Sequence, residues 1–284
     1  MDLSKSEDRK KLFMLANSIN EESALQLKDN PNMKANIKFD GENIMAMKLN
    51  DKVILFNRRG NIKNANYREV VEDLKQLPNC LINGEIISAD DNFQKFSSRI
   101  LTKKADKIKE LEKTIPIKFM VFDVLGIGDI FTNKINLILK DRLIELENLF
   151  FGKEFKHTEL AEYKPIQEMW DKANTEKREG IMVKNMNGKY ECGKRHDNWK
   201  KLKRWNEMDI IVTTYIPNNA GIRVETQDGL IACQVSGEQH NEVKDVLDSE
   251  GKAEITIQYL SLNEENGHVR FPSFVKLIHS DTVR

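Results

Sequence analysis

A lysine stands where a strand-like run enters a turn, in the segment KFDG at residues 38–41. A lysine amine acts as a nucleophile only in its neutral form, which nearby cations favour. Lys201 and Lys203 are candidates for those cations, because residues two apart on a strand project from the same face. The same pair can neutralise charge that develops on phosphate oxygens. These residues indicate covalent chemistry at a phosphate group, with Lys38 as the nucleophile.

Five further motifs follow Lys38 along the chain. They are FNRRG (56–60), NGEI (83–86), FMVFD (119–123), EGIMVK (179–184) and WKKLK (199–203). A match to KFDG alone would more often mark an exposed lysine beside a tight Asp-Gly turn. The ordered series changes that interpretation.

The six motifs together resemble those of the covalent nucleotidyltransferase superfamily of ligases and capping enzymes, over roughly residues 34–206. Connecting segments are similar to those of ATP-dependent DNA ligases: NFQKF (92–96), DRL (141–143) and GKR (193–195). The C-terminal run VRFPSF (269–274) looks like a final strand of the same enzymes. The resemblance therefore covers most of the chain and implies an ATP-dependent DNA ligase.

That resemblance implies a reaction and its partners. Lys38 would attack the α-phosphate of ATP and carry AMP as a lysyl-AMP phosphoramidate. AMP would pass to the 5′-phosphate of a nick in duplex DNA, and the 3′-hydroxyl would then seal the nick. Mg²⁺ (or Mn²⁺) is the implied cofactor, because carboxylates and triphosphates suit it. A monomer acting on nicked DNA in repair, replication or recombination is expected.

The resemblance also assigns a nucleotide site residue by residue. Phe122 is expected to stack on adenine, although a strand phenylalanine is more often plain core. Asn36 stands where ligases often carry glutamate, so its amide is expected to read the adenine amino group. Glu85 and Glu179 are the expected metal ligands. The ATP- or AMP-binding set is Asn36, Lys38, Arg58, Glu85, Phe122, Lys184, Lys201 and Lys203.

Charge is balanced overall, with Lys+Arg 45 against Asp+Glu 45, but it is uneven along the chain. Residues 185–206 carry many basic side chains and only two acidic ones, Glu191 and Asp197. Such a local basic stripe is what contact with phosphates requires. The expected DNA-binding residues are Arg58, Lys194, Arg195 and Arg204.

Two positions depart from the family pattern. Asn43 stands where the first motif usually has an arginine, so a weaker ribose contact is expected. The last ligase motif, which helps to orient the leaving pyrophosphate, reads HSDT (279–282) here. Lys276 and His279 are the residues expected to serve in closure of the C-terminal domain over the active site.

The expected fold is α+β, with an antiparallel-sheet nucleotidyltransferase domain at residues 1–206 and a small OB-fold barrel at 207–284. A helix is predicted over about 6–22 and a hairpin over 36–56, turning at Asn50-Asp51. Further strands are predicted at 81–87, 117–125 and 180–184, and helices near 104–113, 140–150 and 165–177. After Trp205, five short strands with one helix near 240–247 suggest the barrel.

Bulk composition restricts the class of protein. With 284 residues, 39% hydrophobic and 32% charged, the chain is typical of globular proteins. Cys80, Cys192 and Cys233 form no CxxC pair, so neither a disulfide framework nor a zinc site is expected. No apolar run is long enough to span a membrane and no signal core is visible, which favours the cytoplasm. The segment before Lys38 is expected to be too short for a separate DNA-binding domain.

Other functions share some of these features. An RNA ligase and a capping guanylyltransferase use the same lysine and sheet, but the segments NFQKF and VRFPSF favour a DNA ligase. An NAD-dependent ligase is disfavoured, because its accessory domains and four-cysteine zinc site are missing from the sequence. A nick-binding protein with little catalysis is the alternative from another class.

Overall fold

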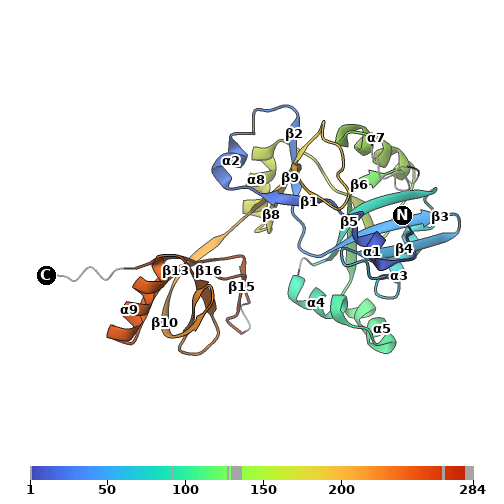
Figure 1. The fold of residues 1–284 in the computed structure, drawn as a ribbon. Coiled ribbons are helices and arrows are strands. Elements are labelled where there is room, and N and C mark those ends of the chain that lie inside the picture. The colour runs from blue at the N-terminus through green and yellow to red at the C-terminus, as the bar shows by residue number, and fades with distance from the viewer. Residues whose placement is uncertain (1, 91, 127, 129–135, 264–265, 279–284) are drawn as a thin grey trace. The chain divides into compact units, whose positions relative to one another are not determined.

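A computed structural model describes residues 2–90, 92–126, 128, 136–263 and 266–278 (Figure 1). The chain divides into two compact units, Met1–Lys203 and Arg204–Arg284. The boundary predicted from the sequence, between residues 206 and 207, lies close to this division. His279 falls outside the described residues. No helix in these ranges is both long and apolar enough to cross a membrane.

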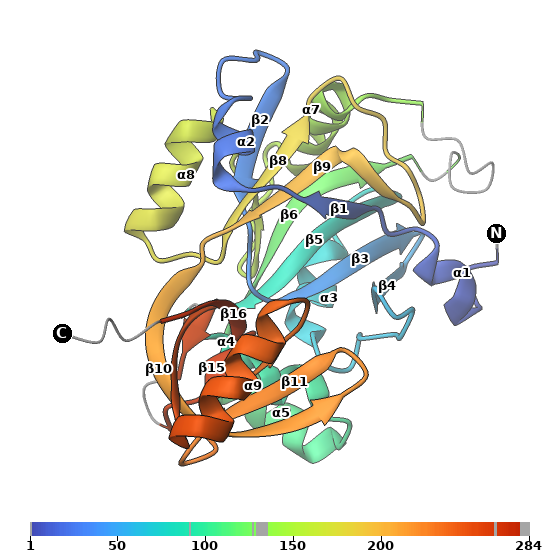
Figure 2. The same ribbon diagram turned by 60° about the vertical axis from the view of Figure 1, so that its left-hand side comes forward.

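The first unit contains two β-sheets (Figure 2). One is five-stranded, in the order β4-β3-β5-β6-β7, and the other is four-stranded, in the order β1-β9-β8-β2. The first comprises β3 (Glu42–Leu49), β4 (Lys52–Asn57), β5 (Cys80–Ser88), β6 (Ile117–Leu125) and β7 (Thr158–Leu160). The second comprises β1 (Leu15–Ser18), β2 (Met33–Ile37), β8 (Gly180–Asn185) and β9 (Arg195–Lys203).

The predicted antiparallel arrangement holds for most of these strand pairs but not for two at sheet edges. Short edge strands make the exceptions, since β7 runs parallel to β6 and β1 runs parallel to β9. The partners in each pair are far apart in sequence, so nothing in the local pattern indicates their relative direction.

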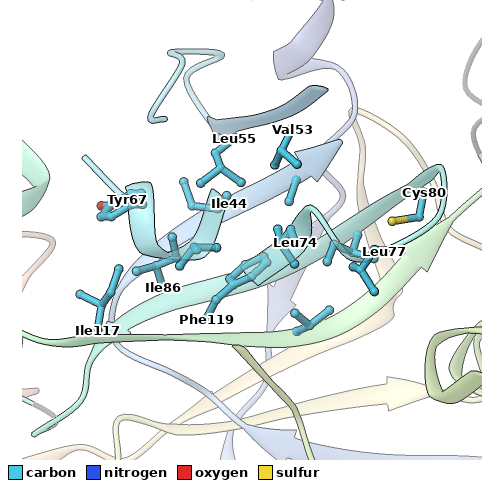
Figure 3. Close-up of a cluster of buried hydrophobic side chains, with 14 of the residues drawn as sticks. Ile44, Val53, Leu55, Tyr67, Leu74, Leu77, Cys80, Ile86, Ile117 and Phe119 are labelled. Carbon is cyan, nitrogen blue, oxygen red and sulfur yellow. The ribbon is translucent and has the colours of Figure 1, made fainter. Parts of the chain in front are cut away.

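The helices of the first unit are α1 (Ser6–Lys10), α2 (Glu21–Leu25), α3 (Arg68–Leu74), α4 (Phe93–Leu101), α5 (Ala105–Thr114), α7 (Leu139–Phe150) and α8 (Ile166–Thr175). All of these except α1 pack on the outer face of a sheet. One core lies between the five-stranded sheet and α3, α4, α5 and α7, with Phe119 and Ile44 at its centre (Figure 3). Another joins α8 to the four-stranded sheet.

A third core fills the space between the two sheets. Met45, Leu81 and Phe122 reach it from the five-stranded sheet, and Trp199 reaches it from β9. Phe13 also enters it, with its ring edge-on to Phe56 at 6.0 Å. Phe56, Phe122 and Trp199, which belong to the quoted motifs, therefore lie in this inter-sheet core.

The single helix predicted over residues 6–22 is wrong. The structure has α1, then β1, then α2 in this region. Leu12, Phe13 and Met14 are all buried in succession, which a helix with one apolar face cannot achieve. The extended chain instead pairs with β9, so tertiary contacts override the helical spacing.

The hairpin predicted over 36–56 is half correct. β3 and β4 do pair around a turn at Asn50, which has φ of 52°. Asn36 and Ile37, however, belong to β2 in the other sheet. The loop after Lys38 carries the chain between sheets, and a Cβ on Gly41 would lie 2.0 Å from the Ile86 carbonyl oxygen. Glycine at this position allows that close crossing.

The other elements predicted for the first unit are confirmed. The strand predicted at 117–125 is β6 with the same bounds, and those at 81–87 and 180–184 lie within β5 and β8. The three predicted helices correspond to α5, α7 and α8. The helices bury one face each, and β5 and β6 are short apolar runs buried on both faces; the local sequence is sufficient to predict both patterns.

The second unit is a five-stranded antiparallel sheet in the order β12-β11-β10-β13-β16. Its strands are β10 (Asn206–Asn218), β11 (Gly221–Thr226), β12 (Ala232–Val235), β13 (Ala253–Tyr259) and β16 (Ser273–Leu277). α9 (Gln239–Glu250) packs on the sheet through Val243 and Leu247. The single strand predicted from VRFPSF is divided at Phe271, φ 53°, into β15 (Val269–Arg270), which pairs with β14 (Ser261–Leu262), and β16.

Candidate active site

Lys38 lies where the chain leaves β2, beside the start of β8. Its backbone N–H donates to the Gly180 carbonyl oxygen at 2.9 Å. Its side-chain Nζ is 2.5 Å from Oε2 of Glu179, the residue just before β8. Lys203 Nζ lies 3.8 Å from the other carboxylate oxygen, Oε1. The largely buried Glu179 carboxylate therefore lies between two lysine ammonium groups and fixes the Lys38 amine in place.

The alternation predicted for the strand WKKLK is confirmed. Leu202 is buried in the core beneath α8. Trp199 points the other way, into the inter-sheet core. By strand alternation Lys201 and Lys203 share that second face, where they stand opposite Met182 and Gly180 of β8.

The predicted cations gather around Lys201. Burial lowers the pKa of Lys201, and four neighbouring positive charges lower it further. In decreasing order of influence, these charges belong to Lys203, Arg195, Lys38 and Arg58. Residues from β2, β4, β9 and the loops after them therefore create one positive field, which is suited to a polyphosphate.

Glu85 is the second acidic group of the site. Burial raises its pKa to about 8, against the opposing effects of the Lys38 charge and a hydrogen bond from Asn43. The charges of Glu179 and Asp40 raise it further. The predicted pair of carboxylates, Glu85 and Glu179, is thus brought together at Lys38.

Asn43 has a role that the sequence did not indicate. It stands opposite Glu85 in the β3–β5 ladder. Its Nδ2 donates to the Gly84 carbonyl oxygen at 2.9 Å and lies 3.2 Å from Asn83 Oδ1. The asparagine that replaces the usual arginine therefore supports the strand that carries Glu85.

The two carboxylates fit a magnesium site that is completed by substrate. Mg²⁺ is usually held by one or two carboxylates together with phosphate oxygens and water. Over the described ranges, no cluster of three or more His, Cys, Asp or Glu side chains could hold a metal ion unaided. Glu85 and Glu179 would supply the protein ligands, and a nucleotide would supply others.

Asn36 presents an unpaired acceptor to the same space. The residue is 1% exposed, and its Nδ2 donates to the Ile37 carbonyl oxygen at 2.8 Å. Its Oδ1 is buried and has no hydrogen-bond partner among the residues that the structure describes. Turning the amide over would place oxygen against the Ile37 oxygen, so the contact supports this orientation. A buried acceptor without a donor is costly, which marks it as a place for a ligand donor.

Residues 13–203, which contain all of these groups, match the family model described as ATP dependent DNA ligase domain. The chain belongs to the ATP-dependent DNA ligase family. The resemblance predicted from the motifs is thereby confirmed. Each residue role assigned by that resemblance stays a prediction.

Curated relatives of this ligase-family chain cover it in part. A probable DNA ligase of Dictyoglomus thermophilum is 30% identical over 176 residues, which is 59% of this chain and 30% of the relative. A DNA ligase of Nitrosopumilus maritimus is 26% identical over 207 residues, 69% of this chain and 35% of the relative. The chain thus spans about a third of the length of these relatives.

Solved structures of low sequence identity share the fold. One named Pmar-Lig_PreS3 has a TM-score of 0.75 at 22% identity, covering 94% of this chain and 67% of its own. The ATP-dependent DNA ligase of bacteriophage T7 in complex with ATP has a TM-score of 0.54 at 18% identity, covering 96% and 100%. These likenesses concern the fold alone.

Lys184, the end of the EGIMVK motif in this ligase-family chain, is enclosed by aromatic side chains. It is 1% exposed, and its Nζ lies 4.3 Å from the ring centre of Phe122 and 4.2 Å from that of Trp199. Its Nζ donates a hydrogen bond to the Tyr163 hydroxyl at 2.6 Å. Burial lowers the pKa of Lys184 to about 7. We call these four residues the aromatic cage.

The cage bears on two predicted nucleotide contacts. Phe122 is 8% exposed, with its ring edge-on to Trp199 and beneath the Lys184 ammonium. The Tyr163 hydroxyl donates to the Phe122 carbonyl oxygen at 2.8 Å, so the cage holds both ring and backbone of Phe122. Stacking of Phe122 on adenine stays a prediction. A contact between Lys184 and the nucleotide is also still a prediction. It would require the Lys184 ammonium to move away from the Phe122 and Trp199 rings.

A buried ion pair, Asp123–Arg142, lies close enough to the aromatic cage for both charges to act on Lys184. Arg142 donates to both Asp123 oxygens, through Nε at 2.7 Å and Nη2 at 2.9 Å. Both residues are at most 1% exposed, and the guanidinium also lies 5.6 Å from the Tyr190 ring centre. Asp123 and Arg142 lie in the quoted motifs FMVFD and DRL, but their pairing could not be predicted from those motifs.

Three of the four predicted DNA-binding residues occupy exposed positions in the first unit. Arg58 lies in the loop after β4, Lys194 directly precedes β9, and Arg195 is the first residue of β9. Lys194 is paired with Glu191 at 3.2 Å, and Arg195 donates to the Ala16 carbonyl oxygen. In the second unit, Arg204 donates to Asn206 Oδ1 at 2.8 Å. Their contact with DNA stays a prediction.

Proposed function

We propose that this chain seals 5′-phosphate/3′-hydroxyl nicks in duplex DNA, using ATP, through lysyl-AMP on Lys38 and a 5′-adenylated DNA intermediate. The observation that supports this most directly is the Lys38 amine, held by Glu179 within a cluster of positive charges. Phosphoryl chemistry needs such a nucleophile and such a field together. The chain spans about a third of the length of its curated relatives, so their activity is not transferred to it and nick sealing is proposed here.

In the first step, the Lys38 nitrogen attacks the α-phosphorus of ATP. The P–N bond forms as the P–O bond to pyrophosphate breaks, and the amine must lose a proton. Glu179 Oε2, at 2.5 Å from Nζ, is placed to accept that proton. Lys201 and Lys203 neutralise charge on the α-phosphate oxygens. A Mg²⁺ ion bound by Glu85 and Glu179 would stabilise the charge on the phosphates.

In the next two steps, the nick replaces ATP. An oxygen of the DNA 5′-phosphate attacks the AMP phosphorus and the P–N bond to Lys38 breaks, which restores the amine. The 3′-hydroxyl oxygen then attacks the adenylated 5′-phosphorus, and AMP leaves. Arg58, Lys194 and Arg195 would hold the DNA backbone during both steps by neutralising its phosphates.

Asn36 supports adenine as the base. Its unpaired Oδ1 is an acceptor, and the amino group of adenine is a donor. Guanine presents a carbonyl oxygen at the corresponding place, which would leave two acceptors facing one another. This argues against the guanylyltransferase alternative and is consistent with an ATP-dependent enzyme.

For the second unit we propose an OB fold that assists the ATP step. Support comes from its five-stranded antiparallel sheet with one helix between the third and fourth strands. Lys276 is an exposed residue of β16 and is assigned, with His279, to orienting the leaving pyrophosphate. Arg204 is assigned to DNA backbone contact. The role of Lys276 and His279 rests on their place at the altered last motif, and that of Arg204 rests on the basic stripe at residues 185–206.

A sealing assay tests the proposal. The full chain would be given nicked DNA, nicked RNA and mixed duplexes with ATP and Mg²⁺, and labelling with α-phosphate-labelled ATP and GTP would be run in parallel. Sealing of nicked DNA with labelling by ATP alone is expected. Sealing restricted to RNA, or labelling by GTP, would favour the other superfamily members. Nick binding without labelling would indicate a binding protein.

A further inference from the structure

Arg9 is a buried arginine without a carboxylate partner among the described residues. It lies in α1, ahead of the region 13–203 that matches the ligase family, and is 6% exposed. Its guanidinium donates to three carbonyl oxygens: Gly60 at 2.7 Å, Leu3 at 2.7 Å and Ser4 at 2.9 Å. Burying a charge is expensive, so these carbonyls must compensate for lost water.

The bond to Gly60 fastens the loop that carries Arg58. The Gly60 N–H donates to the Asn57 carbonyl oxygen at 2.7 Å, and Asn57 Oδ1 accepts from the N–H groups of Arg59 and Asn61 at 3.0 Å each. These bonds set the shape of the loop but connect it only to itself. At the start of the loop, Asn57 Nδ2 donates to Glu42 Oε1 at 2.8 Å. For residues 58–60 of the described chain, the Arg9 bond is the one hydrogen bond to a distant segment.

Other contacts bring the same N-terminal segment, residues 3–13, against this loop. We call that segment the N-terminal latch. Gly60 has φ of +78°, and a Cβ there would lie 2.2 Å from the Ser6 carbonyl oxygen, so the latch touches the loop backbone directly. At the other end of the latch, Phe13 packs edge-on against Phe56, which precedes the loop.

The loop also lies within the electrostatic field of the catalytic lysines. Arg58 is exposed, and its charge is among those that lower the pKa of Lys201. The conformation of a tight turn sets the direction of an exposed arginine side chain at its tip, and so decides which phosphate the guanidinium can reach. The position of the turn therefore decides whether Arg58 takes part in the reaction.

We propose that Arg9 is a positioning residue, which holds the loop 57–61 so that Arg58 meets a phosphate of the nucleic acid. This inference rests on the proposed ligase function, because it assumes a phosphate partner for Arg58. Through this contact Arg9, which precedes the matched family region, takes part in the site. A displacement of about 1 Å can cost roughly 100-fold in rate, so loss of Arg9 should be felt at Arg58.

The test is a double-mutant cycle in the full chain. Single-turnover rates would be measured for self-adenylation, AMP transfer to a nick, and sealing of a pre-adenylated nick. The variants are Arg9→Gln, Arg58→Gln and the double variant. Lys10→Gln is the matched control, because it removes an exposed charge from the same helix. Gly60→Ala disturbs the same contact from the loop side and serves if Arg9→Gln does not fold.

We expect Arg9→Gln to slow the same step as Arg58→Gln, by roughly 10- to 100-fold, with the double variant within about 2-fold of Arg58→Gln. Arg9→Lys should restore part of the rate, and Lys10→Gln should match the unmodified chain. Multiplying effects, or a uniform loss in all three steps, would show that Arg9 only stabilises the fold. If the unmodified chain seals nicks while Arg58→Gln has no effect, this inference fails and the proposed function stands. If the unmodified chain seals nothing, the proposed function fails.

Discussion

Two lysines of the four-stranded sheet, Lys38 after β2 and Lys184 in β8, have opposite surroundings. The Lys38 side chain keeps 20% of its surface exposed and is paired with the Glu179 carboxylate. Lys184 is 1% exposed, and it meets two ring faces and the Tyr163 hydroxyl. One amine is held beside a proton acceptor in an open charged site, and the other is sealed inside the inter-sheet core.

Under the proposed function, the contrast means that access outweighs proton affinity in selecting the nucleophile. Burial lowers the pKa of Lys184 to about 7, which favours the neutral amine. A neutral amine is the reactive form, yet an amine that no phosphate reaches cannot react. Lys38 has access and a carboxylate beside its amine, whereas Lys184 is buried and its hydrogen-bond acceptor is the Tyr163 hydroxyl. Five substitutions test this contrast.

The largest effect is expected at Lys38. Lys38→Arg should abolish labelling by α-phosphate-labelled ATP, because water cannot replace the amine in a phosphoramidate. Lys184→Met should still become labelled, within roughly 10-fold of the unmodified rate, since its amine is not the nucleophile. Gel detection of covalent AMP would measure both. A labelled Lys38→Arg protein, or a label mapped to Lys184, would reverse the assignment.

The next effect concerns the ion pair behind the cage. Asp123→Asn leaves the buried Arg142 charge without its partner and should lower the free energy of unfolding by about 3–5 kcal/mol. Asp197→Asn, which removes an exposed partner of Lys200, should change little. Urea denaturation of both variants gives the comparison. Equal losses would mean that the buried pair does not stabilise the cage.

Lys184 should also give stability a pH dependence. The pKa of Lys184 is about 7 in the folded state and 10.5 in the unfolded state. Between these pH values the unfolded state therefore binds more protons than the folded state. The free energy of unfolding should therefore rise with pH across that window, by at most about 1.4 kcal/mol per unit from this group. Lys184→Met should be most stabilising below pH 7 and progressively less so toward 10.5.

The control for that experiment is Lys189→Met, which changes an exposed lysine of the next loop. Denaturant midpoints of the three proteins would be recorded from pH 6 to pH 10. If Lys184→Met and the unmodified chain have the same denaturant midpoint at every pH, burial of the Lys184 ammonium does not lower the free energy of unfolding.

A smaller effect is expected at Asn36. Asn36→Leu removes the unpaired acceptor and should reduce the preference for ATP over GTP by roughly 10-fold, about 1–2 kcal/mol. Self-adenylation rates at limiting nucleotide would be compared for the two bases. Asn36→Asp, which keeps an acceptor, is the matched variant and should retain the preference. Unchanged discrimination in Asn36→Leu would remove the adenine contact.

The smallest effect concerns DNA binding at the exposed side of the site. If Arg58 neutralises one phosphate, Arg58→Gln should reduce the log–log salt slope of nick affinity by about 0.9. Binding would be measured from low to moderate salt by fluorescence anisotropy. Arg68→Gln, an exposed arginine paired with Glu112, is the control. An unchanged slope in Arg58→Gln would separate Arg58 from the DNA footprint.

Local pattern is sufficient for much of this chain, for a physical reason. A strand side chain alternates between faces, so WKKLK already places Lys201 and Lys203 on one face and Leu202 on the other, as the structure confirms. The helices near 104–113, 140–150 and 165–177 follow from periodicity that one buried face enforces, and the strand at 117–125 follows from a short apolar run that is buried on both faces. The family likewise follows from ordered motifs.

Long-range packing decides the rest, because nothing nearby in the sequence specifies it. Leu15–Ser18 becomes strand β1 because β9 offers a partner that is far away in sequence, at Leu15↔Arg195. β2 enters a different sheet from β3 because Gly41 permits the crossing. Lys184 becomes a caged ammonium only when Phe122 and Trp199 arrive from two other strands. A residue type sets what a side chain can do, and its tertiary neighbours set which of those things it does.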